Sequence, residues 1–339
     1  MPRRKSAKPV KVEVMSWENP RGHAALMAQY FEWMRVRAYS ETTVRRSYEI
    51  LGQFIKWCEA RSLHRPQDLT RPILERYQRH LYYYRKRNGE PMSFWTQHGH
   101  LGAIQKWFSY LTKQHYILSN PAADLDLPKV RRKLPRFVLT VEEVEQVLNT
   151  VKLHEPLGPR DRAILETFYS TGIRRSELIN LCLYDLDVTR DVLTIREGKG
   201  KKDRMIPIGP RAQAWIRKYV EDVRPGLVME PDEGTLFLTV DGEPFSQNHL
   251  TKIVRLYIRQ SGIGKQGSCH LFRHTMATLM LEGGADLRYI QSMLGHAEIS
   301  STEIYTHVAI KKLKEIYLAT HPGAKLKKEK EVSQEDSAG

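Results

Sequence analysis

The sequence predicts a mainly α-helical protein with one small antiparallel β-sheet, organised as a helical N-terminal domain and an α+β C-terminal domain. The length of 339 residues lies at the upper limit of what one hydrophobic core usually serves. Apolar residues recur at helical spacing through most of the chain, and the spacing changes to that of strands around residues 192–208. With 41% apolar residues, the chain can form two cores.

Residues 21–120 contain four apolar stripes at helical spacing, which predict a four-helix domain. The stripes start near Ala24, after an N-cap at Ser40, after Thr70 and near Leu101. The Thr70 hydroxyl is expected to cap a helix that has Pro72 in its first turn. Trp57 and Trp107 lie on the stripes, and we expect both side chains in the core.

Residues 121–138 are predicted to form an extended basic linker. The Asn120-Pro121 pair ends the helical pattern, and prolines at 128 and 135 bracket four cations, Lys129, Arg131, Arg132 and Lys133. Two interpretations remain open, a segment that crosses a phosphate backbone and a solvated hinge. Residues 1–20 form a basic arm and residues 323–339 a charged tail, and both are expected to be poorly ordered.

Residues 139–322 form the predicted α+β domain. A capping box at Thr140 and Glu143 starts its first helix. Segments 192–196 and 204–208 flank a Gly-Lys-Gly turn and predict a hairpin, with 235–239 as a third strand. Further helices are expected near residues 159–170, 175–183, 212–223, 247–260, 270–281, 287–293 and 308–320.

The net charge of +15 indicates a polyanionic partner. Residues 1–140 contain 26 lysines and arginines against 11 acidic residues, so this part carries the whole excess. Three widely spaced cysteines fit a reducing compartment, and we expect ordinary thiols. Because no apolar run is long enough to span a bilayer, we expect a cytoplasmic, nucleoid-associated protein.

Six polar residues of the second domain are unremarkable singly but form an ordered set: Arg174, Lys199, His270, Arg273, His296 and Tyr305. Their motifs are Thr-Gly-Ile-Arg174, Gly-Lys199-Gly, His270-Leu-Phe-Arg273-His-Thr, Leu-Gly-His296 and Ile-Tyr305-Thr-His-Val. The set resembles the active-site signature of the tyrosine recombinase (phage integrase) family, and most of all its Xer-type members. The likeness covers roughly residues 24–322, with one departure at Cys269, where a different small residue or proline is expected.

The resemblance implies a site-specific recombinase whose core-binding and catalytic domains close as a clamp on DNA. Tyr305 would attack phosphorus and form a 3′-phosphotyrosyl intermediate, without ATP or metal. A phenol with a pKa near 10 is ionised in only about one molecule in a thousand at pH 7, so it needs assistance. Arg174 and Arg273 would bind the non-bridging oxygens, and His296 would add a hydrogen bond. Lys199 would protonate the 5′ oxygen, and His270 would take the phenolic proton, although phosphate or water could also take it.

Glu177 follows Arg174 by three residues, so we expect it to orient the arginine or a histidine, or else to form a local surface pair. His270 and His274 have a spacing that can bind zinc, but the sequence offers no third ligand at a suitable spacing. We therefore expect neither a cofactor nor a metal ion.

The expected partner is a double-stranded DNA recombination site bound by a homotetramer that passes through a Holliday junction, as the resemblance implies. Helix 308–319 would dock on a neighbouring protomer or on its own domain, and a second recombinase or accessory protein could take part. Type IB topoisomerase activity and an inactive architectural protein are the alternatives. Chromosome-dimer resolution, plasmid resolution and mobile-element integration are not distinguished by the sequence.

Overall fold

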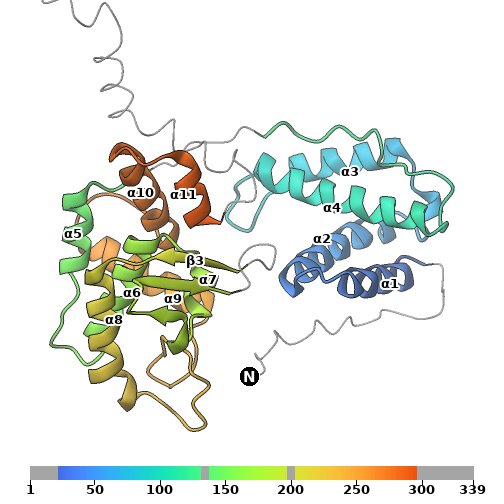
Figure 1. Ribbon diagram of the computed structural model, residues 1–339. Helices are drawn as coiled ribbons and strands as arrows, with labels where there is room; N and C mark the ends of the chain where they lie inside the picture. Colours follow the sequence, from blue (N-terminus) through green and yellow to red (C-terminus); the bar gives the residue numbers. More distant parts are fainter. Residues whose placement is uncertain (1–21, 131–136, 197–202, 296–339) are drawn as a thin grey trace, which may run out of the picture. The chain divides into compact units, whose positions relative to one another are not determined.

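The computed structural model describes residues 22–130, 137–196 and 203–295 (Figure 1). The chain divides into two compact units, Met1–Arg132 and Lys133–Gly339, each with its own hydrophobic core. No helix among the described residues has the length and apolar character needed to cross a membrane. The mainly α-helical fold with one small antiparallel sheet is confirmed.

The first unit contains the four expected helices and a short 3-10 turn, Pro66–Asp68. The helices are α1 (His23–Val36), α2 (Glu41–Glu59), α3 (Arg71–Tyr83) and α4 (Phe94–Lys113). Ser40 caps α2, because its hydroxyl accepts a hydrogen bond of 3.3 Å from the amide of Thr43. The cap expected at Thr70 was wrong: its side chain makes no capping bond. Pro72 has no N–H, so this helix start has one donor fewer to satisfy.

Aromatic side chains fill the core of the first unit. Trp107 is fully buried and Trp57 nearly so, as expected. Phe54 packs edge-on against Tyr77, with the ring centroids 4.8 Å apart, a favourable arrangement for aromatic quadrupoles. Ala122 and Leu125 are also buried in this core, so the unit continues beyond residue 120 into the segment expected as a linker. The boundaries of that linker stay a prediction.

The second unit surrounds a small sheet with helices (Figure 1). Its helices are α5 (Val141–Asn149), α6 (Gly158–Thr171), α7 (Arg175–Ile179), α8 (Pro210–Asp222), α9 (Gln247–Gln260), α10 (Cys269–Glu282) and α11 (Leu287–Leu294), with 3-10 turns at Leu183–Asp185 and Arg224–Gly226. The capping box is confirmed: Thr140 Oγ1 accepts from the amide of Glu143, and the Glu143 carboxylate accepts from the amide of Thr140.

The sheet has the order β1-β2-β3 and is antiparallel throughout. Its strands are β1 (Leu186–Asp187), β2 (Val192–Ile195) and β3 (Arg204–Pro207), and the predicted hairpin is the β2–β3 pair. The third strand expected at 235–239 was wrong. Residues 236–238 are all buried instead of alternating, and the segment forms only isolated bridges, one of them between Thr235 and Cys182.

Helix α6 is the centre of the second core, because nearly every residue along it is buried. It packs against α8 and α10. It ends at Gly172, which has a left-handed φ of +59° and ends the helix just before Arg174. The short α7 starts directly after Arg174. This turn therefore sets the position of the first residue of the predicted site.

Candidate active site

Three arginines from separate elements converge on the carboxyl end of α11. The carbonyls of three successive residues each accept one hydrogen bond: Met293 from Arg204 Nε (3.0 Å), Leu294 from Arg273 Nη2 (2.8 Å) and Gly295 from Arg174 Nη2 (3.0 Å). Carbonyls at the end of a helix have no partner within the helix and carry partial negative charge. The helix end therefore gathers three guanidinium groups in one place.

Arg273 lies on α10 and is 3% exposed. Its Nη1 donates a 2.7 Å hydrogen bond to the carbonyl of Gly172, so it joins the end of α6 to the end of α11. Glycine is favoured at 172, because φ there is positive and a Cβ would lie 2.1 Å from Met276 Cε, so that the methionine side chain would have to move. The glycine of the Thr-Gly-Ile-Arg motif thus ends α6 at the point where its carbonyl accepts the hydrogen bond from Arg273.

Glu177 bonds Arg174, which is one of the contacts that the spacing allowed. The Glu177 side chain is 4% exposed, and its carboxylate accepts 2.8 Å hydrogen bonds from both the backbone amide and Nη1 of Arg174. Arg204 donates from Nη1 and Nη2 to the same carboxylate at 3.0 and 2.8 Å. Burial alone would raise the pKa of Glu177, but the bonds from the two arginines outweigh it and lower the pKa to about 2. Glu177 is therefore an anion at any physiological pH.

His270 lies in the first turn of α10 and is exposed. Partial desolvation of its ring, followed by the charges of Arg273, Arg175 and Arg174, lowers its pKa below 6.5. The neutral ring that results at pH 7 can accept a proton. His274 is 6.4 Å away between ring centroids, and burial lowers its pKa to about 4.

The structure therefore brings Arg174, Glu177, His270 and Arg273 together. Lys199, His296 and Tyr305 lie outside the described residues, as do Arg131, Arg132, Lys133 and helix 308–319. Within the described ranges, no group of three or more histidine, cysteine or acidic side chains is arranged to hold a metal ion.

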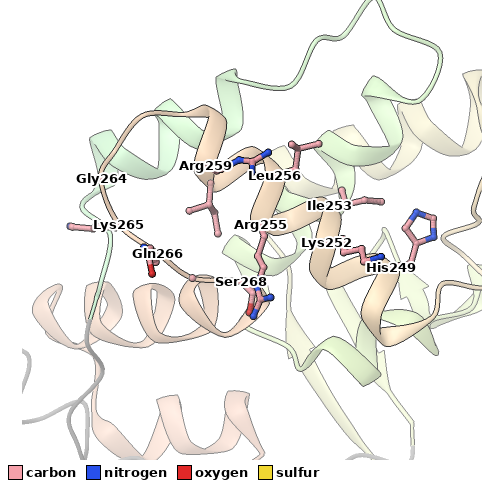
Figure 2. A pocket seen from close by; sticks show the side chains of 12 residues that line it. His249, Lys252, Ile253, Arg255, Leu256, Arg259, Gly264, Lys265, Gln266 and Ser268 are labelled. Atoms are coloured by element: carbon pink, nitrogen blue, oxygen red, sulfur yellow. The ribbon is translucent and has the colours of Figure 1, made fainter. Parts of the chain in front are cut away.

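A basic groove of about 1060 Å³ runs along α9 (Figure 2). Its basic side chains are His249, Lys252, Arg255 and Arg259, with Lys265 from the loop that follows. The first four are exposed and recur at helical spacing on one face. Sequence reasoning missed this face because the second half of the chain is neutral in sum. The spacing of the cations within the predicted helix 247–260 was the available signal.

Arg175 connects this groove with the arginine site. Its Nη1 donates to Thr251 Oγ1 at 2.7 Å and its Nη2 to Gln247 Oε1 at 2.8 Å, both on α9. The neighbour of Arg174 is therefore anchored to the helix that forms the groove.

Comparison with known proteins agrees with this arrangement. Residues 138–312 match the model of the phage integrase family. Tyrosine recombinase XerC 2 of Ralstonia nicotianae is 49% identical over 314 residues, which are 92% of this chain and 90% of that protein. The XerC recombinase of Natranaerobius thermophilus is 42% identical over 66% of this chain and 75% of its own.

The chain therefore belongs to the phage integrase family. Within it the chain is similar to Xer-type tyrosine recombinases, and its activity is site-specific recombination by cleavage and rejoining of DNA strands. The fold also matches the crystal structure of XerH recombinase bound to a palindromic difH substrate, with a TM-score of 0.68 at 22% identity, over 86% of this chain and 83% of that one.

Proposed function

We propose that Arg174, Arg273 and His270 form the phosphate-binding part of the recombination site and that Tyr305 is its nucleophile. The observation that supports this most directly is the convergence of Arg174 and Arg273 on the adjacent carbonyls of residues 294 and 295. Two guanidinium groups fixed side by side match the non-bridging oxygens of one phosphodiester.

The reaction exchanges one phosphoester for another. The Tyr305 oxygen forms a bond to phosphorus, the bond to the 5′ oxygen breaks, and the 3′ phosphate stays on the enzyme as a phosphotyrosyl ester. A 5′ hydroxyl later attacks this ester and releases the tyrosine. Because the ester bond is conserved in each step, the sequence of steps balances without ATP.

The arginines neutralise charge that grows on the phosphate in the transition state. His270, neutral at pH 7, accepts the proton of Tyr305, and Lys199 supplies a proton to the leaving 5′ oxygen. His296 donates a further hydrogen bond to the phosphate, and Glu177 orients Arg174. The roles of Lys199, His296 and Tyr305 follow from the family motifs in which they stand.

The substrate is a double-stranded DNA recombination site. Two features support this: the excess charge of residues 1–140 and the groove along α9, whose cations are spaced to meet phosphates or base edges. We further propose that residues 21–120 and 139–322 clamp the duplex, that Arg131, Arg132 and Lys133 in the linker contact its backbone, and that residues 1–20 and 323–339 are a flexible arm and tail.

Assembly follows the family pattern in this proposal. Four protomers pair two DNA sites and exchange strands through a Holliday junction, with helix 308–319 docked on a neighbouring protomer. The likeness to XerC and XerD proteins favours resolution of chromosome or plasmid dimers at the nucleoid.

The test is incubation with a target duplex that is nicked close to the cleavage point, followed by denaturing electrophoresis. The nick traps the covalent intermediate, so wild type should give a protein band linked to DNA and Tyr305→Phe should give none. If the band persists in Tyr305→Phe, another residue is the nucleophile. Relaxation of supercoiled DNA without recombinant products would point to a topoisomerase, and DNA binding by wild type without any covalent band would point to an architectural protein.

A further inference from the structure

One arginine of the site belongs to none of the family motifs quoted above. Arg204 opens β3, and its guanidinium uses all three nitrogens: Nη1 and Nη2 bind the two oxygens of Glu177, and Nε binds the carbonyl of Met293. Its side chain is 14% exposed and that of Glu177 is 4% exposed. Because the guanidinium is planar and its donors are fixed, it can bond Glu177 and Met293 at once only if these two residues keep one relative position.

The guanidinium also packs against the backbone of Gly295. A Cβ at this residue would lie 3.0 Å from Cζ, Nε and Nη1 of Arg204, and φ at Gly295 is +60°. Glycine is therefore needed both for the left-handed turn and for the close approach of the arginine. The carbonyl of this same glycine accepts the hydrogen bond from Arg174.

Arg174 thus bonds two groups in the site, the Glu177 carboxylate and the Gly295 carbonyl, and Arg204 contacts both of these residues. One is Glu177, on which Arg204 bonds both oxygens. The other is Gly295, which Arg204 covers while it binds the carbonyl two residues earlier. Arg204 is therefore the link from β3 to both the Glu177 carboxylate and the end of α11.

We propose that Arg204 is a positioning residue for recombination: it fixes the Glu177 carboxylate and the end of α11 relative to each other, and thereby aims Arg174 at the phosphate. This rests on the proposed role of Arg174. Arg204 itself need not touch DNA.

Arg204→Gln should slow formation of the covalent intermediate on the nicked duplex by roughly 10–100-fold, the usual cost of removing a group that orients a reactive residue. The affinity for the duplex, measured by gel shift, should stay near the wild-type value, because the change affects orientation and not the basic groove along α9. The single-turnover rate at saturating protein isolates this effect.

Arg224→Gln is the matched control. Arg224 is also a buried arginine of the second unit that binds a carboxylate through two nitrogens, Asp232, and a backbone carbonyl, that of Thr235. None of its partners lies in the site. Both variants are expected to lose stability, and only Arg204→Gln should lose cleavage rate at a temperature where both are folded.

The pH profile separates a positioning role from loss of structure. Glu177 faces Arg204 from β3 and Arg174 at the start of α7, while Arg273 and His270 on α10 and Arg175 on α7 complete the charged groups around the site. In Arg204→Gln the pKa of Glu177 rises from about 2, so the carboxylate is neutralised as pH falls and cleavage should decline at a higher pH than in wild type. In Arg204→Gln/Glu177→Gln this shift should disappear, and the rate should be no lower than in the worse single variant.

A wild-type rate and pH profile in Arg204→Gln would overturn the proposal, as would a loss of rate equal to that in Arg224→Gln. If Arg204→Gln does not fold, Arg204→Lys decides, because a single ammonium nitrogen cannot reproduce the three fixed donor positions that hold both oxygens of Glu177 and the carbonyl of Met293; wild-type behaviour of that variant counts against the proposal. Absence of a covalent complex in wild type would instead refute the proposed function, so the two failures are distinct.

Discussion

The two units of the chain use their charges in opposite ways. Among residues 22–130, the ion pairs lie at the surface, for example Arg71–Glu75 with side chains 50% and 46% exposed. The second unit has surface pairs too, such as Lys218–Asp222, but it also pairs carboxylates and arginines in its interior, as in Arg160–Asp161 and Arg162–Glu166. The first core is aromatic and the second is crossed by these ionic contacts.

This difference shows that the net charge of a unit does not indicate whether its charged side chains form a catalytic site. Exposed cations of the first unit are available to a polyanion and supply affinity that depends on salt. Buried pairs contribute little net stability when formed but cost much when broken, so they fix geometry. Residues 141–339 are neutral in sum, yet arginines such as Arg175 and Arg273 are held there by neutral oxygens.

The largest expected effect comes from breaking a buried pair. Arg162–Glu166 and Arg71–Glu75 have the same chemistry and the same i,i+4 spacing, but Glu166 is 1% exposed and also binds Arg211. Glu166→Ala should lower the free energy of unfolding by about 3–5 kcal/mol, because the buried Arg162 loses its counter-charge, while Arg211 keeps its pair with Glu145. Urea denaturation of wild type and Glu166→Ala measures this difference in the free energy of unfolding.

Glu75→Ala is the control, with an expected loss below about 1 kcal/mol. Equal losses in the two variants would show that burial does not distinguish the units.

The next effect concerns catalysis. Arg174→Ala should reduce the rate of covalent complex formation by roughly 10²–10³-fold, the cost of one donor to a charged transition state, and leave DNA affinity nearly unchanged. Arg45→Ala, at an exposed cation of the first unit, should leave the cleavage rate at saturating protein unchanged. A rate loss at Arg45 would break the assignment of catalysis to the second unit.

The smallest effect concerns the basic stretch between the units. If Arg131, Arg132 and Lys133 each contact a phosphate, replacing all three with glutamine should reduce the slope of log affinity against log salt by roughly 2.7, at about 0.9 per contact. Lys218→Gln, on an exposed residue paired with Asp222, is the control and should leave the slope unchanged. An unaltered slope in the triple variant would identify the stretch as a solvated hinge.

Local patterns made much of the fold predictable from the sequence. Helical spacing gave the helices of both units, and side-chain caps such as Thr140 marked one of their starts. Motifs that are short in sequence gave Arg174 with Glu177 and His270 with Arg273, because one helical turn places each pair together. Sequence patterns failed where tertiary contacts determine the secondary structure. The two-residue strand β1 is too short to show a period, and the buried residues 236–238 have the composition of a strand without forming one.

Arg204 was missed for the same reason, since its partners Glu177 and Met293 are 27 and 89 residues away in the chain. The basic face of α9 was missed because acidic residues elsewhere cancel its charge.

The carboxyl end of α11 offers its carbonyls, and not its side chains, to the three arginines. Every amino acid has a carbonyl, so these hydrogen bonds place no demand on the side chains of Met293 and Leu294, which serve the core instead, where both are buried. An alanine scan of the helix would therefore find no catalytic residue there, although the helix end orients Arg174 and Arg273. Substitution of Gly295 would disturb the helix end directly, because a methyl group there would contact Arg204. The backbone geometry of this helix end, and not the chemistry of its side chains, therefore supplies the anchors for the arginines.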